Sequence, residues 1–303
     1  MPESSARTRP RPDPRPSNTG VTPPPPPASP HLGTGLRSRL DWYEWTADGL
    51  DDGRIPSALA VALGARVTEG KPKNGYGRAA VVARGEDVLA IVYGGSSRTG
   101  EVHVVTSGES CDEVVPIVRR LWPAHRVSRA DSSLDFAGDF DALDAQLVAF
   151  CTEGRRLKHE RITNSEGGAT LYVGGRTFEV RLRLYKKSEQ LLALHPDRAH
   201  AIPPGIVRVE VQVRPGKRAA KESLSTLEPD DLFGMAQWTA DYAAAVLGLQ
   251  PDRTATHFRR PSDWSRAVFF LGKQYGPMVE RRIADVGRDA ARAEVLRALG
   301  LSS

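Results

Sequence analysis

Alternation of apolar and polar residues in three segments constrains the fold more than any other feature of the chain. The segments read RVSRADSSLDF, FEVRLRLYKK and VRVEVQVR, at residues 126–136, 178–187 and 207–214. Successive side chains of a β-strand point to opposite faces of a sheet, so each segment predicts a strand with one apolar and one polar face. This pattern is typical of antiparallel sheets, and the apolar face is expected to pack beneath helices.

The remaining segments predict an α+β fold, in which an antiparallel sheet is backed by helices and followed by a helical C-terminal region. Gly174-Gly175 is expected in a hairpin turn, where a positive φ costs glycine little. Further strands are expected at residues 41–47 and 101–108, and hairpins at 77–95 and 170–187. Helices are expected at residues 56–63, 111–122, 138–154, 231–248, 262–287 and 288–300.

Composition divides the chain into three parts. Eleven of the first 30 residues are proline, and four arginines punctuate the same stretch. Proline lacks the amide hydrogen that helices and sheets use, so residues 1–38 are expected to form a disordered arm. This arm either is a solvated tail or contacts DNA or a partner through its arginines. Residues 39–216 are expected to form the α+β domain, and residues 217–303 a helical region that packs on it or completes it.

Charge and cysteine content narrow the class of protein. The net charge of +5 and the pI of about 9.3 suit a polyanionic partner. Cys111 and Cys151 form no CxxC or Cys/His cluster, so a structural zinc site or disulfide framework is not expected. No stretch of 18 uncharged apolar residues or signal-peptide pattern occurs. We therefore expect a cytoplasmic protein without a membrane partner.

Three acids occupy polar positions of the expected strands, where acidic residues are depleted. They are Asp131, Asp135 and Glu210. Carboxylate oxygens suit a hard divalent cation such as magnesium or manganese, so these acids are candidate metal ligands. Arg129 and Arg208 lie on the same polar faces, and structural ion pairs with them are the alternative.

Tyr185 shares the polar face of its strand with Arg181 and Arg183, and Lys186 and Lys187 follow it directly. A phenolate can attack a DNA phosphate and hold the cut end as a phosphotyrosine ester. The reference pKa of tyrosine is about 10, and nearby cations favour its ionised form. Tyr185 is therefore a candidate nucleophile, and an ordinary strand tyrosine is the alternative.

Several sequence blocks resemble those of the replication initiation factors, the Rep-trans family of rolling-circle plasmid and phage initiators with its related relaxases. The blocks RADSSLDF, GGATLYVGGR, RLYKKSE and VRVEVQVR occur in the order and at the spacing of that family. DWYEWTA near the start and FLGKQYGP near the end resemble its flanking blocks. The likeness spans residues 40–287, which is nearly all of the expected globular chain.

The resemblance implies a metal-dependent, origin-specific endonuclease and strand transferase that cuts one DNA strand to initiate rolling-circle replication. It also implies a sheet of the HUH-endonuclease type in a catalytic domain at residues 39–216. By correspondence, Tyr185 joins the 5′ phosphate and Lys187 supports it. Asp131, Asp135 and Glu210 would hold magnesium or manganese. The residues expected to bind DNA are Arg129, Arg181, Arg183, Lys186 and Arg208.

The chain also departs from the family pattern, and several alternatives stay open. The paired histidines of typical HUH enzymes are absent, and His103 stands alone. Lys186 follows the tyrosine where the family often has an acid, and Tyr172 is a second candidate nucleophile. A conjugative relaxase that cuts a transfer origin and a non-catalytic DNA-binding regulator of the same fold are the rival functions.

The expected partners follow from the same resemblance. The main partner is DNA carrying a replication or transfer origin. No second motif suggests an ATPase, so a host helicase is expected to unwind the DNA, and a host polymerase is expected to extend the 3′ hydroxyl. Formation of a homodimer is an open alternative.

Overall fold

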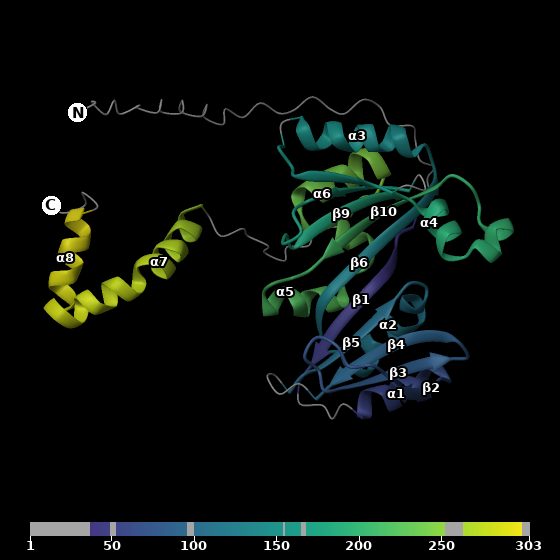
Figure 1. The fold of residues 1–303 in the computed structure, drawn as a ribbon, viewed down its shortest axis with the longest axis horizontal. Coiled ribbons are helices and arrows are strands. Elements are labelled where there is room, and N and C mark those ends of the chain that lie inside the picture. The colour runs from purple at the N-terminus through teal and green to yellow at the C-terminus, as the bar shows by residue number, and fades with distance from the viewer. Residues whose placement is uncertain are drawn as a thin grey trace, which may run out of the picture. The chain divides into compact units, whose positions relative to one another are not determined.

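The computed structural model describes residues 37–48, 53–95, 100–153, 155–164, 168–251 and 263–298. Ten strands in this part of the chain form one antiparallel sheet, in the order β2-β3-β4-β5-β1-β6-β10-β9-β8-β7 (Figure 1). Helices lie against the sheet, so the fold is α+β, as the sequence predicts. The three alternating segments are the strands β6, β9 and β10, and they are neighbours in the sheet.

The strands begin and end close to the predicted positions. In chain order they are β1 (Arg39–Ala47), β2 (Arg66–Glu69), β3 (Arg78–Arg84), β4 (Asp87–Gly94), β5 (Val102–Ser107), β6 (Arg126–Ala137), β7 (His159–Thr163), β8 (Ala169–Val173), β9 (Val180–Lys186) and β10 (Ile206–Val213). The sequence patterns missed β2 and β7, whose residues are all exposed. Both are edge strands of the sheet, so they lack the apolar alternation by which the inner strands were predicted.

The helices of the first 251 residues are α1 (Arg54–Leu63), α2 (Ser110–Leu121), α3 (Phe140–Thr152), α4 (Lys187–Leu194), α5 (Arg218–Ser223) and α6 (Gln237–Tyr242). Four shorter segments are η1 (Pro196–Ala201), η2 (Leu224–Thr226), η3 (Asp230–Met235) and η4 (Ala243–Leu247). Helix α1 contacts β2 and β3, and α2 contacts β1, β4 and β5. Helix α3 contacts β9, and η3 contacts β6 and β10.

The apolar face of the central strands is the core beneath these helices. Leu182, Leu184, Val209 and Val211 are fully buried on β9 and β10. Each buried aliphatic side chain of this size contributes about 1.5–3 kcal/mol of hydrophobic free energy. The alternation predicted from the sequence is therefore realised, with the polar residues of the same strands on the opposite face.

A single helix over residues 231–248 was predicted, and this prediction is wrong. The structure divides the segment into η3, α6 and η4, because Ala236 has an extended backbone at φ −132° and ψ 147°. The Thr239 hydroxyl donates to the Ala236 carbonyl oxygen at 2.8 Å and accepts from its N–H at 3.3 Å. A threonine that bonds the backbone three residues before it in this way starts a new helix turn and interrupts a longer one.

The chain separates into two compact units, residues 1–254 and 255–303. The second unit contains α7 (Asp263–Val286) and α8 (Arg288–Ala298), which an ion pair between Arg282 and Glu294 joins at 2.8 Å. Residues 217–251 belong to the first unit, and the predicted domain limits at 38 and 216 stay predictions. The predicted arm at residues 1–38 lies almost wholly outside the described residues. No helix in the described ranges is long and apolar enough to cross a membrane.

Candidate functional site

The strand order β6-β10-β9-β8 brings the three predicted polar faces onto one side of one sheet. Residues directly opposite each other on neighbouring strands share a face. Arg208 is opposite both Tyr185 and Asp135. Glu210 is likewise opposite Arg183 on one side and Ser133 on the other. The acids, the arginines and the tyrosine singled out in the sequence therefore lie on consecutive rungs of the ladder.

Tyr185 is buried in the middle of this face, with 7% of its surface exposed. Its hydroxyl donates to Glu210 Oε2 at 3.5 Å. Burial raises the pKa of Tyr185 and the negative charge of Glu210 raises it further, while Arg208 and Arg183 oppose the change. The balance is a raised pKa, so the phenol is protonated at neutral pH. The sequence led us to expect that nearby cations would favour the phenolate, and burial outweighs them.

Glu210 is the acceptor of that hydrogen bond and is itself fully buried. Burial raises the pKa of Glu210 to about 7, although the Arg183 guanidinium acts in the opposite direction. Asp131 also raises it, both through its charge and through a hydrogen bond with Glu210. A carboxylate that titrates near neutrality can accept a proton in a reaction at physiological pH.

Every acid predicted as a metal ligand is paired with an arginine. The pairs are Asp131 with Arg129, Asp135 with Arg208 and Glu210 with Arg183. The Arg129 Nε–H donates to Asp131 Oδ1 at 2.9 Å, and the Arg208 Nη2–H donates to Asp135 Oδ2 at 2.6 Å. These two pairs are bidentate, which is the strong form, so Arg129 and Arg208 fix the orientation of their carboxylates.

This arrangement does not fit a divalent cation as it stands. Within the described ranges, no group of three or more histidine, cysteine or acidic side chains is placed to hold a metal ion. The arginines already neutralise the carboxylates that a cation would need, so a cation would have to displace them. The assignment of Asp131, Asp135 and Glu210 as metal ligands stays a prediction.

Two residues at the edge of the face extend the network. Asp41 on β1 accepts a hydrogen bond from Arg208 Nη1 at 2.8 Å. The sequence patterns did not single out Asp41, because its strand was predicted from its aromatic residues. Lys187 begins α4 immediately after β9 and donates to Gln190 Oε1 at 3.0 Å. Burial lowers the pKa of Lys187, and the positive charge of Arg208 lowers it further. Lys187 is therefore a readier proton donor than an ordinary lysine.

The residues predicted to bind DNA fall into three groups. Arg129, Arg181 and Arg183 are partly buried on the polar face. Arg208 is 1% exposed, and its guanidinium is held by Asp41 and Asp135, so it lies beneath the surface of that face. Lys186 takes the other side of its strand, since its Nζ lies 5.5 Å from the centre of the Phe140 ring on α3.

The second candidate nucleophile, Tyr172, shares the polar face. It lies on β8 opposite Arg183, one rung from Tyr185. The Arg181 guanidinium stacks on its ring, with Cζ 4.0 Å from the ring centre. Both tyrosines therefore stand among arginines, and the hydrogen bond to the buried Glu210 belongs to Tyr185.

Tyr185 also lines a cleft of about 500 Å³ between the β7–β8 hairpin and α4. Several of the other lining residues are exposed and apolar. Ile162, Leu192 and Leu194 are 45%, 38% and 63% exposed. Ile162 is opposite Thr170, which is opposite Tyr185, so the cleft opens on the same face of the sheet as the tyrosine. A hollow with apolar walls can receive an unstacked base, and the cation among its lining residues, Lys186, is paired with Glu189 at 3.3 Å.

Fold and site together define an α+β protein with a buried tyrosine, a buried carboxylate of raised pKa and several arginines on one face of an antiparallel sheet. No family model and no curated protein matches the chain. Among solved structures, it is similar to a rolling circle replication initiator protein from Geobacillus stearothermophilus, with 18% sequence identity and a TM-score of 0.47. The match covers 66% of this chain and 83% of that one.

Proposed function

We propose that this chain is an origin-specific, single-strand DNA endonuclease and strand transferase that initiates rolling-circle replication through a covalent 5′-phosphotyrosine. One observation carries the proposal: the Tyr185 hydroxyl donates to the buried Glu210 at 3.5 Å on a face that carries partly exposed arginines. The resemblance of the sequence blocks to replication initiation factors supplies the choice of substrate.

In the proposed reaction, Glu210 takes the hydroxyl proton while Tyr185 Oη attacks the phosphorus. The new Oη–P bond forms as the bond from phosphorus to the 3′ oxygen breaks. The leaving 3′ oxygen takes a proton from the Lys187 ammonium, which gives a free 3′ hydroxyl and a 5′-phosphotyrosine. Strand transfer is the reverse reaction, in which a 3′ hydroxyl attacks the phosphotyrosine and Tyr185 leaves.

The raised pKa of Glu210 serves this role because a base of higher pKa draws the proton more strongly. Proton transfer also changes Arg183. Once Glu210 is neutral, its ion pair with Arg183 weakens, and the arginine charge becomes available to the phosphate. The Arg183 side chain is 29% exposed, so it can meet the DNA from the surface of the face. Positive groups directed at the transferring phosphoryl group stabilise its developing charge.

The test uses a supercoiled plasmid that carries the DNA adjoining the gene. The wild-type chain should give nicked circles and a covalent protein–DNA adduct, and Tyr185→Phe should give neither. Tyr172→Phe is the matched control, because it removes a hydroxyl from the same face and should leave the adduct intact. Mass spectrometry of the peptide joined to an origin oligonucleotide locates the tyrosine. Nicking that persists in Tyr185→Phe would contradict the site assignment.

The burial of Tyr185 favours a second candidate, a DNA-binding regulator of the same fold that does not cut. A phenol that is 7% exposed and has a raised pKa is a poor nucleophile unless a base removes its proton. The two functions differ in the adduct. A regulator binds single-stranded DNA without forming one, and its binding is unchanged by Tyr185→Phe.

A further inference from the structure

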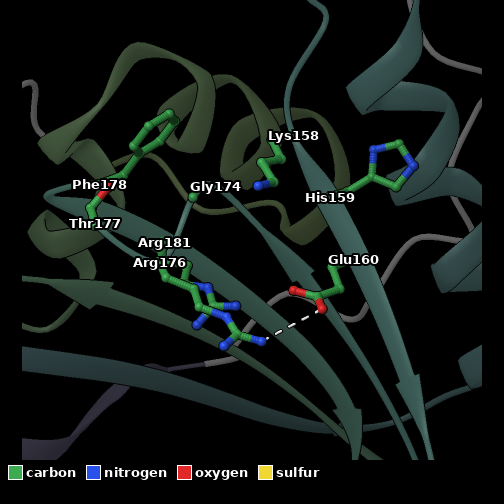
Figure 2. A pocket seen from close by; sticks show the side chains of 9 residues that line it. Lys158, His159, Glu160, Gly174, Arg176, Thr177, Phe178 and Arg181 are labelled. Atoms are coloured by element: carbon green, nitrogen blue, oxygen red, sulfur yellow. Dashed lines mark ion pairs between the residues drawn. The ribbon is translucent and has the colours of Figure 1, made fainter.

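A second hollow, of about 280 Å³, lies at the opposite end of β9 on the same face of the sheet. The start of β7 and the loop between β8 and β9 enclose it (Figure 2). Arg181 lines it and lies four residues before Tyr185 on one strand, so the two positions are about 13 Å apart. We call this hollow the Arg181 pocket. A single DNA strand that follows β9 would pass both the Arg181 pocket and Tyr185.

The Arg181 pocket has an excess of positive charge. Lys158, Arg176 and Arg181 contribute cations, and Glu160 is the acid among its lining residues. Figure 2 shows the Arg176–Glu160 ion pair, in which Nη2 and Oε1 are 3.6 Å apart. This pair leaves the charges of Lys158 and Arg181 unbalanced within the pocket. The chemistry therefore suits an anion.

Arg181 carries a further sign of a missing ligand. Its Nε is buried and has no hydrogen-bond acceptor within the described residues. An unpaired buried donor costs about 1–3 kcal/mol, and a phosphate oxygen would satisfy it. The stacking on Tyr172 holds the guanidinium plane in place at 4.0 Å from the ring centre. Arg181 is thus oriented before any ligand arrives.

An aromatic ring completes the pocket. Phe178 is 43% exposed, an unusual position for a phenylalanine in a turn of charged and small residues. The turn holds the main chain of Phe178, since its N–H donates to the Gly175 carbonyl oxygen at 3.0 Å. A Cβ atom on Gly175 would lie 3.1 Å from that ring, so glycine lets the ring pack against the backbone. An exposed ring in a pocket that cations also line is a stacking platform for a nucleic-acid base.

We propose that the Arg181 pocket binds one nucleotide of the strand that reaches Tyr185, with the phosphate on Arg181 and Lys158 and the base against Phe178. The proposal rests on the function proposed above. A volume of about 280 Å³ lies just below the smallest ligand sites, about 300 Å³, so the pocket has room for no more than one nucleotide. The separation of about 13 Å spans at most about four stacked nucleotides. The pocket therefore fixes which phosphate is presented to Tyr185.

The test measures binding in a Tyr185→Phe background, so that no cleavage is needed. The ligand is a fluorescent single-stranded oligonucleotide of about 16 nucleotides, followed by anisotropy. Phe178→Ala should weaken binding about tenfold, within the range found for the loss of one stacked base. Phe178→Tyr keeps the ring and should restore affinity, whereas Phe178→Leu should not. A purely structural role of the ring would not separate the tyrosine from the leucine variant in this way.

The salt dependence of binding tests the phosphate contact. Lys158→Ala should lower the slope of log affinity against log salt concentration by about one, because one phosphate contact is lost. Lys71→Ala is the matched control, since Lys71 is also exposed but lies outside the pocket, and it should leave the slope unchanged. Equal affinities for the Phe178 variants and equal slopes for both lysine variants would contradict the proposal that the Arg181 pocket binds a nucleotide. Absence of single-strand binding in every protein would instead overturn the proposed function.

Discussion

Glu210→Gln removes the proposed proton acceptor with the smallest change of shape. Glutamine keeps the side-chain volume and can still meet the Tyr185 hydroxyl, but it cannot take a proton at neutral pH. General-base catalysis contributes about 10²–10⁴ in rate. The single-turnover rate of adduct formation should fall by about that factor. Glu109→Gln is the matched control, because its side chain is 90% exposed and its rate should equal that of the wild type.

The pH profile gives the same variant a second, sharper test. A base must be deprotonated to act, so the wild-type rate should rise with pH and level off above the pKa of Glu210, about 7. Glu210→Gln should lose this rise. A wild-type rate that is flat between about pH 6 and pH 8, or a variant rate within about threefold of the wild type, would refute the assignment of Glu210 as the base.

Folding stability should respond to the same group. The pKa of Glu210 is raised from 4.5 in the unfolded chain to about 7 in the folded one, so the folded state binds the proton more tightly. This contribution to stability is present in full below pH 4.5 and is lost as pH rises through 7. The loss amounts to about 3 kcal/mol. Denaturant unfolding at several pH values should show that decrease in the wild type and not in Glu210→Gln.

Two further predictions concern the arginine network and the metal. Arg208→Met should lower the free energy of unfolding by about 1–3 kcal/mol in denaturant titration, because the partly exposed Asp41 and Asp135 lose their shared hydrogen-bond donor. A loss below about 0.5 kcal/mol would show that the pairs do not hold the fold. If the acids exchange their arginines for a cation, EDTA should abolish nicking and manganese should restore it. Nicking at full rate in EDTA would show that Asp131, Asp135 and Glu210 form ion pairs with arginines and bind no cation.

The sheet could be predicted where burial imposes alternation on the sequence. Strands β9 and β10 each carry buried aliphatic residues at every second position, and that period fixes which side chains share a face. The edge strands β2 and β7 have no buried residues, so their sequences carry no such period. The prediction failed for the helix at 231–248 because a local bond from Thr239 to the backbone overrode a good helical pattern.

The sequence predicted which residues make up the site, but it did not predict their protonation states. Strand alternation placed Tyr185 with Arg183, and the register placed Glu210 beside both. The protonation of these groups depends on burial, and burial depends on chain segments distant in sequence. Sequence reasoning therefore anticipated a cation-activated phenolate. The structure instead has a protonated phenol on a carboxylate of raised pKa.

Tyr185 lies between two hydrogen-bonded neighbours, with Thr170 opposite it on β8 and Arg208 opposite it on β10, and α4 begins two residues later. Its main chain is thus pinned from both sides, and rotation about the side-chain bonds is the motion left to the hydroxyl. In the proposed nicking reaction, an unpaired DNA strand can rotate about its backbone bonds until its phosphorus meets the Tyr185 oxygen, whereas a duplex is too stiff to adjust in this way. With Tyr185 as the proposed nucleophile, the fixed main chain of β9 therefore selects single-stranded over double-stranded DNA.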